Sequence, residues 1–116
     1  MNNSKLTPTQ ILKITNILRS LGFNCSHIGT KLLNKTIQYL LINNMEFFTL
    51  EEIYNYLHTI YGFNAKTIKS NINKAIYNRK IEVSKKNFER IFGFEYDEYY
   101  FSNKKLIEEI LNILSQ

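Results

Sequence analysis

Apolar residues recur at helical spacing, three or four positions apart, along most of the chain. The first stripe follows the pattern i, i+3, i+7 and i+10 and consists of Ile11, Ile14, Leu18 and Leu21. A cap residue, a proline at the first helical position and a glutamine at the third precede it in the segment Thr7-Pro8-Thr9-Gln10. Gly22 follows the stripe and is a typical helix stop. These signals predict a first helix between Pro8 and Gly22.

The same signals predict five further helices. We expect them at about residues 30–42, 50–61, 65–79, 84–92 and 103–114. Thr49-Leu50-Glu51-Glu52 forms a capping box at the start of one helix, and Asn64 can cap the next. Residues 94–101 are rich in aromatic and acidic side chains, so we expect them to be extended or irregular. The predicted fold class is all-α, a six-helix bundle that occupies residues 1–116 as a single domain.

Only three residues, Gly62-Phe63-Asn64, separate the third predicted helix from the fourth. Because so short a turn leaves the chain little freedom, it forces the two helices to cross at a steep angle. This geometry is typical of a helix-turn-helix, which we expect at about residues 50–79.

The predicted fourth helix, residues 65–79, has a polar face without any acidic residue. Its apolar stripe consists of Ile68, Ile72, Ala75 and Ile76. The opposite side consists of Lys66, Thr67, Lys69, Ser70, Asn73, Lys74 and Tyr77. Lysine donates to guanine or phosphate, asparagine pairs with adenine, and hydroxyls serve either role. The pattern predicts a recognition helix in the major groove of double-stranded DNA, with these side chains contacting bases or phosphates.

The net charge of +5 is concentrated around this helix. Residues 66–90 carry eight basic and two acidic side chains, a net of +6, so the rest of the chain is slightly acidic. A field of this kind attracts a polyanion. We expect the DNA backbone to be held by Arg79, Lys80, Lys85 and Lys86. The alternative interpretation is a solvated, lysine-rich helix face that has no partner.

Several segments in collinear order resemble one known family over residues 14–114, without gaps over 22–94. They are Gly22-Phe23 and Gly29, Leu33 and Ile37, the stretch YLHTIYGFNAKTIKSNINKAI at 56–76, Phe92-Gly93-Phe94, Ser102-Asn103 and Leu106-Ile107. They resemble the C-terminal effector domain of the sporulation master regulators (stage-zero sporulation protein A) of endospore-forming bacteria. The resemblance implies a six-helix bundle around a helix-turn-helix, among the winged-helix-like effector domains of response regulators. It also implies a bacterial transcription factor.

The chain departs from that family in three ways. Only Met1 to Leu6 precede the first predicted helix, so we expect no phosphoacceptor receiver domain in the same chain. The family's recognition helix has arginine, glutamate, arginine, arginine and histidine where this chain has Thr67, Lys69, Ser70, Asn73 and Lys74. His58 stands where the first helix of the motif usually has a small residue. The planar guanidinium of arginine can donate two hydrogen bonds side by side, and the ammonium group of lysine cannot. We therefore expect a different or weaker preference for DNA sequence.

The remaining side chains form no pattern of an enzyme or a metal centre. Cys25 is the only cysteine, which excludes an intrachain disulfide, and with His27 and His58 it makes at most three metal ligands. The sequence contains no nucleophile triad, paired-acid motif or glycine-rich phosphate loop. We therefore expect no catalytic residue, metal, cofactor or small-molecule ligand. The lack of a long apolar run and of a signal peptide predicts a cytoplasmic protein without a membrane span.

Two functions stay open at this stage. The first is a transcription regulator that binds DNA alone, as a homodimer or as a tandem pair. The second is a protein-interaction module that pairs with a full-length regulator, or antagonises it, without binding DNA. We interpret the aromatic strip of Tyr96, Tyr99, Tyr100 and Phe101 as a loop folded over the core, with a protein contact surface as the alternative.

Overall fold

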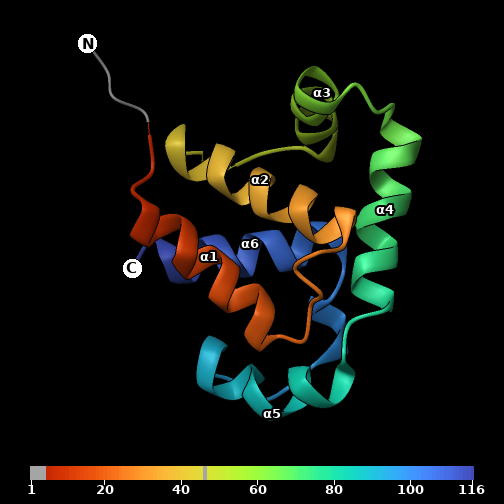
Figure 1. The fold of residues 1–116 in the computed structure, drawn as a ribbon. Coiled ribbons are helices and arrows are strands. Elements are labelled where there is room, and N and C mark those ends of the chain that lie inside the picture. Colours follow the sequence, from red (N-terminus) through yellow and green to blue (C-terminus); the bar gives the residue numbers. More distant parts are fainter. Residues whose placement is uncertain (1–4, 46) are drawn as a thin grey trace.

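The computed structural model describes residues 5–45 and 47–116, and within these residues the chain forms six α-helices and no strand (Figure 1). They are α1 (Pro8–Ser20), α2 (Ile28–Ile42), α3 (Leu50–Tyr61), α4 (Ala65–Tyr77), α5 (Ile81–Phe92) and α6 (Asn103–Leu114), with a 3-10 turn at Glu98–Tyr100 before α6. The prediction of an all-α fold is confirmed. Residues 1–4, on which the interpretation of the N-terminus partly depends, lie outside the described residues.

Three helices begin where their cap sequences predicted. Thr7 and Gln10 each accept the other's backbone N–H and together cap α1. Thr49 and Glu52 form the same reciprocal pair at the start of α3. The Asn64 Oδ1 accepts a first-turn N–H at 2.8 Å and caps α4. Each cap satisfies backbone donors that a helix start otherwise leaves unpaired.

Three helix ends differ from the prediction because other interactions set them. α2 begins at residue 28 instead of 30, since the Nδ1 of His27 accepts a first-turn N–H at 2.9 Å and acts as its cap. α5 begins at residue 81 instead of 84, directly after Lys80, whose N–H donates to the Gly22 carbonyl at 2.9 Å. α4 ends at residue 77 instead of 79, as the chain turns toward that contact. The apolar stripes contain no information about these contacts.

α2 lies at the centre of the bundle and packs against α1, α3, α4 and α6. Its buried residues are Gly29, Thr30, Leu32, Leu33, Thr36, Ile37 and Leu40. Figure 1 shows α3 and α4 meeting at a steep angle, with α4 running along one side of the bundle and α5 beneath it. α4 therefore has one side against the core and the other side toward solvent.

A close backbone contact holds α4 against α2. A Cβ atom added at Gly29 would lie 1.9 Å from the carbonyl oxygen of Asn71 and 2.8 Å from the Cβ of Ala75. Glycine is therefore required at this position, because any side chain would push the two helices apart. The contact determines which side of α4 faces inward, and so which side is exposed.

The aromatic segment after α5 folds over the core. Phe88 is fully buried, and its ring centroid lies 5.4 Å from that of Phe94 and 5.3 Å from that of Tyr96, both in edge-on geometry. Phe101 is also buried, whereas Tyr99 is 61% exposed. The interpretation of this segment as a loop over the core is confirmed, and Tyr99 is its outward side chain.

Candidate nucleic-acid interface

α4 buries its apolar stripe and exposes the polar side. The buried residues are Ile68, Ile72, Ala75 and Ile76. The exposed residues, which together line a shallow depression along the helix, are Lys66, Lys69, Ser70, Asn73, Lys74 and Tyr77. Thr67 is half-buried at the edge of this surface. All seven predicted contact residues on α4 thus share one side of one helix, which we call the α4 face.

The α4 face has a central row of residues with a lysine on each flank. Helical residues advance by about 100° each, so the central row consists of Lys66, Ser70, Asn73 and Tyr77. Lys69 and Lys74 then lie roughly 60–80° to either side of that row. Two flanking cations with the short polar side chains of Ser70 and Asn73 between them match a groove whose edges are negatively charged and whose base is polar.

The carboxamides on and beside α4 differ in what they already bind. Asn64 caps the helix, and the Nδ2 of Asn71 donates to the Thr67 carbonyl at 3.0 Å. The side chain of Asn73 has no hydrogen-bond partner among residues 5–45 and 47–116. Within the same residues, no lysine of the α4 face forms an ion pair. Its polar groups are therefore available to a ligand.

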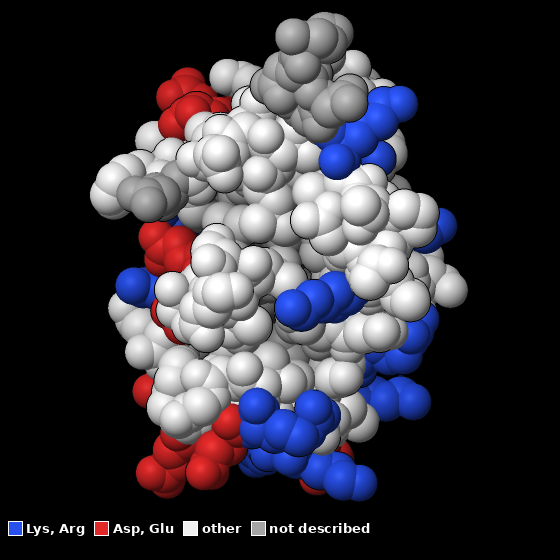
Figure 2. Space-filling view, turned by 90° about the vertical axis from the view of Figure 1, so that its left-hand side faces the viewer, with Lys and Arg blue, Asp and Glu red and all other residues white. Residues whose placement is uncertain are grey.

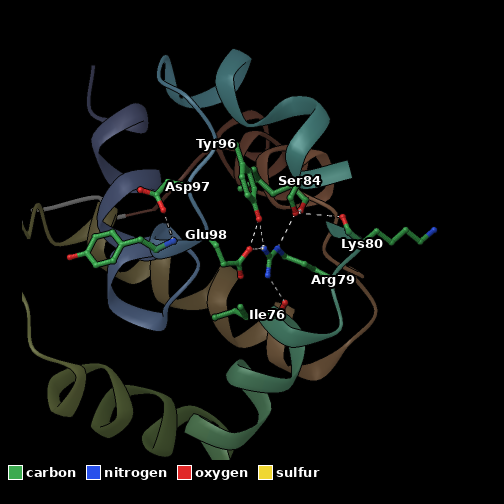
Figure 3. A network of polar contacts seen from close by, with 9 residues as sticks. Ile76, Arg79, Lys80, Ser84, Tyr96, Asp97 and Glu98 are labelled. Atoms are coloured by element: carbon green, nitrogen blue, oxygen red, sulfur yellow. Dashed lines mark hydrogen bonds and ion pairs between the residues drawn. The ribbon is translucent and has the colours of Figure 1, made fainter. Parts of the chain in front are cut away.

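Arg79 does not belong to this surface, and the expectation that it holds the DNA backbone is wrong. The residue is only 5% exposed, and its guanidinium lies 3.6 Å from the ring centroid of Phe101. Its Nε donates to Ser84 Oγ at 2.9 Å, and its Nη1 donates to the Ile76 carbonyl at 2.9 Å (Figure 3). A guanidinium bonded in this way cannot turn outward to a phosphate.

Glu98 completes the surroundings of Arg79. The Arg79 Nη2 lies 2.8 Å from the Glu98 Oε1 and 3.2 Å from the Tyr96 hydroxyl, which also donates to Glu98. Partial burial acts to raise the pKa of Glu98, but the hydrogen bonds from Tyr96 and Arg79 outweigh it and hold that pKa below its ordinary value. Arg79 therefore ties the end of α4 to the segment before α6.

The other three predicted backbone contacts are exposed and lie on the next element. Lys80 precedes α5, and Lys85 and Lys86 lie on that helix. The Nζ of Lys85 is 5.8 Å from the ring centroid of Tyr96. These three cations therefore lie outside the α4 face, on α5 or on the segment that connects α4 with α5.

The two histidines have structural positions that the sequence did not reveal. His27 caps α2, and the Nδ1 of His58 is 2.9 Å from the carbonyl of Phe63. Because a carbonyl only accepts, this nitrogen of His58 is the donor, and the bond braces the turn between α3 and α4. In the described part of the chain, no three His, Cys, Asp or Glu residues gather as metal ligands.

A second hollow, of about 980 Å³, is lined by residues from the C-terminal parts of α2 and α6. These helix ends lie on the side of the molecule away from α4 (Figure 1). Its lining includes Leu40, Leu41, Phe48, Leu111, Glu108 and Glu109. Phe47 also lines it and is 87% exposed. Figure 2 views the molecule from the side away from α4; uncharged areas separate acidic side chains, mostly on the left, from basic ones, mostly at the right and the lower edge. We call the hollow lined by these residues the α2–α6 hollow.

No protein-family model, curated protein or solved structure matches the chain. Among the helices of the described residues, none has both the length and the apolar character that crossing a bilayer requires.

Proposed function

We propose that this protein is a DNA-binding transcription regulator, and not an enzyme, that inserts α4 into the major groove of double-stranded DNA. In this proposal α3 and α4 act as a helix-turn-helix with α4 as the recognition helix. The observation that carries it is the α4 face, an exposed and acid-free surface with a cation on each flank. The resemblance to sporulation-regulator effector domains supports the same function.

The dimensions of the two partners agree with this arrangement. An α-helix with its side chains is about 10–12 Å across, and the major groove is about 12 Å wide. With the central row toward the bases, Lys69 points to one phosphate strand and Lys74 to the other. Ser70 and Asn73 then face the base edges, where hydroxyls and carboxamides give sequence preference.

α5 supplies the second part of the contact. Lys80, Lys85 and Lys86 follow α4 directly and are exposed, so they bind phosphates beside the groove that α4 enters. Contacts of this kind orient a protein on the duplex without reading its sequence. Arg79 has no part in this contact, because its guanidinium is bonded inside the molecule.

Fluorescence anisotropy with a labelled duplex across a salt series tests the proposal. If about five phosphates are neutralised, the logarithm of the affinity falls against the logarithm of the salt concentration with a slope of roughly −4 to −5. A flat response, or no binding at low salt, overturns the proposal.

A protein-interaction module is the second candidate, and the α2–α6 hollow favours it. Phe47 is 87% exposed and lies with Leu41 and Phe48 in the lining of the hollow, and apolar side chains that are grouped at a surface mark interaction sites. Pull-downs with and without nuclease distinguish the two functions. A protein partner that survives nuclease treatment and is lost with Phe47→Ser, from a chain that binds no duplex, would favour this candidate over DNA binding.

A further inference from the structure

We infer that the duplex is read at an adenine by the carboxamide of Asn73, so that the preferred site has an A·T pair where the middle of α4 meets the bases. This inference rests on the proposed function and deepens it. It names the base class that the α4 face selects and the residue that selects it.

The α4 face has no arginine side chain. A bidentate arginine is the commonest reader of guanine. The chain has three arginines, and the one nearest to α4 in sequence is Arg79, whose guanidinium is bonded to buried groups. Arg19 lies on α1, where it donates to Asn16 at 3.1 Å, and Arg90 lies near the end of α5. The α4 face therefore has no guanidinium to offer a guanine.

Asn73 differs from the other asparagines on and beside α4. Asn64 and Asn71 are bonded to the backbone of α4 itself. Asn73 is exposed, lies in the central row and has no partner among the described residues. A free asparagine at this place can accept from the adenine N6 amino group and donate to N7, a pairing that no other base satisfies.

Lys69 and Lys74 lie on the flanks, where phosphates are nearer than base edges. Lys66 is the only lysine of the central row, so it is the rival reader, through guanine. Ser70 lies one turn before Asn73, and its short side chain leaves Asn73 room to approach the base edges.

The experiment begins with selection of bound duplexes from a pool with a random central segment. The affinity of the best duplex is then measured by anisotropy after single adenines are replaced by 7-deazaadenine, which lacks N7 but still pairs with thymine. We expect one position at which the wild type loses about two- to tenfold in affinity, the worth of one hydrogen bond. Asn73→Ala should lose affinity for the adenine duplex and show no further loss with 7-deazaadenine.

Lys69→Ala is the matched control, because it removes a contact of the same helix that carries no base information. It should weaken binding equally for adenine and 7-deazaadenine duplexes. Circular dichroism of each variant verifies that the helices are intact.

The possible failures are distinguishable. If no duplex binds, the proposed function is overturned and this inference falls with it. If duplexes bind but no adenine position responds, the inference alone is overturned. The same holds if 7-deazaguanine weakens binding and Lys66→Ala removes that sensitivity, since guanine would then be the base that is read.

Discussion

At the scale of single residues, Arg79 shows how a cation in a basic sequence can be structural. Its neighbours in sequence suggest a solvent-exposed phosphate contact. In the fold it instead satisfies Ser84 and the Ile76 carbonyl, both inside the molecule, and pairs with Glu98 at the surface. The geometry of these bonds uses the planar fork of arginine, which a lysine lacks.

We therefore predict that Arg79→Lys lowers the free energy of unfolding by about 2–3 kcal/mol, because buried acceptors lose their donors. Arg90→Lys, an exposed change on α5, should stay within about 0.5 kcal/mol of the wild type. Urea denaturation measures both values. If a variant at position 79 kept wild-type stability but bound DNA more weakly, the result would show that Arg79 contacts DNA.

A second residue-scale prediction concerns acid. Folding depresses the pKa of Glu98, so its stabilising contribution is complete above the ordinary value of 4.5 and disappears as the pH falls through the lower value of the folded state. Glu98→Gln should be less stable than the wild type at neutral pH, and the difference should close in acid. The difference will be modest, since the Glu98 side chain is 61% exposed and solvent screens the pair. A pH series of thermal melts of the wild type and the variant measures the difference, and a difference that stays constant into acid would contradict the prediction.

At the scale of elements, the packing of α2 against α4 decides how α4 is presented. The two backbones meet at Gly29 and Asn71, where there is no space for a side chain. A rotation of α4 about its axis would bury lysines of the α4 face and expose isoleucines. The presentation of α4 therefore depends on a residue that lies on another helix.

Gly29→Ala tests this dependence. Alanine normally stabilises a helix interior by about 0.5–1 kcal/mol relative to glycine. Here the added carbon would overlap Asn71, so we expect a net loss of about 1–3 kcal/mol. Lys31→Ala, at an exposed position of the same helix, should change the free energy of unfolding by less than about 0.5 kcal/mol. Equal stability of both variants would mean that the helices separate at little cost.

The helices were largely predictable because caps and stripes are local signals. Thr7, Thr49 and Asn64 cap the helices that their sequences indicated. The α4 face was predictable for the same reason, since its exposure follows the helical period. The burial of Arg79 was not, because its partner Glu98 lies 19 residues later, beyond a second helix and in an irregular segment. The bond of Lys80 to Gly22, which fixes the start of α5, connects segments even further apart.

At the scale of the whole molecule, the excess positive charge is concentrated in residues 66–90, although the net charge of the chain is only +5. Lysines of α4 lie along one side of the fold and those of α5 lie on the helix beneath it, while the α2–α6 hollow has Glu108 and Glu109 in its lining. The field thus favours one approach of a polyanion over others.

A charge-matched pair of variants separates this local effect from net charge. Lys69 and Lys74 changed together to glutamine should reduce the magnitude of the salt slope by about 2, because two phosphate contacts are lost. Lys5 and Lys13 changed together to glutamine lower the net charge equally but lie before and on α1, so the slope should hardly move. Anisotropy titrations at several salt concentrations measure both. Equal slopes for the two variants would show that only total charge matters.

The outward side chains of Ser70 and Asn73 have no hydrogen-bond partner within the described chain, while Gly29, Asn64 and His58 shape the helix and its turn from other positions. The residues proposed to contact bases and the residues that stabilise the fold are therefore different ones. Substitutions at Ser70 and Asn73 should therefore leave the free energy of unfolding nearly unchanged. Under the proposed function they would alter the preferred DNA sequence. Libraries randomised at those two sites should yield mostly folded proteins, and under the proposed function these proteins would prefer different DNA sequences.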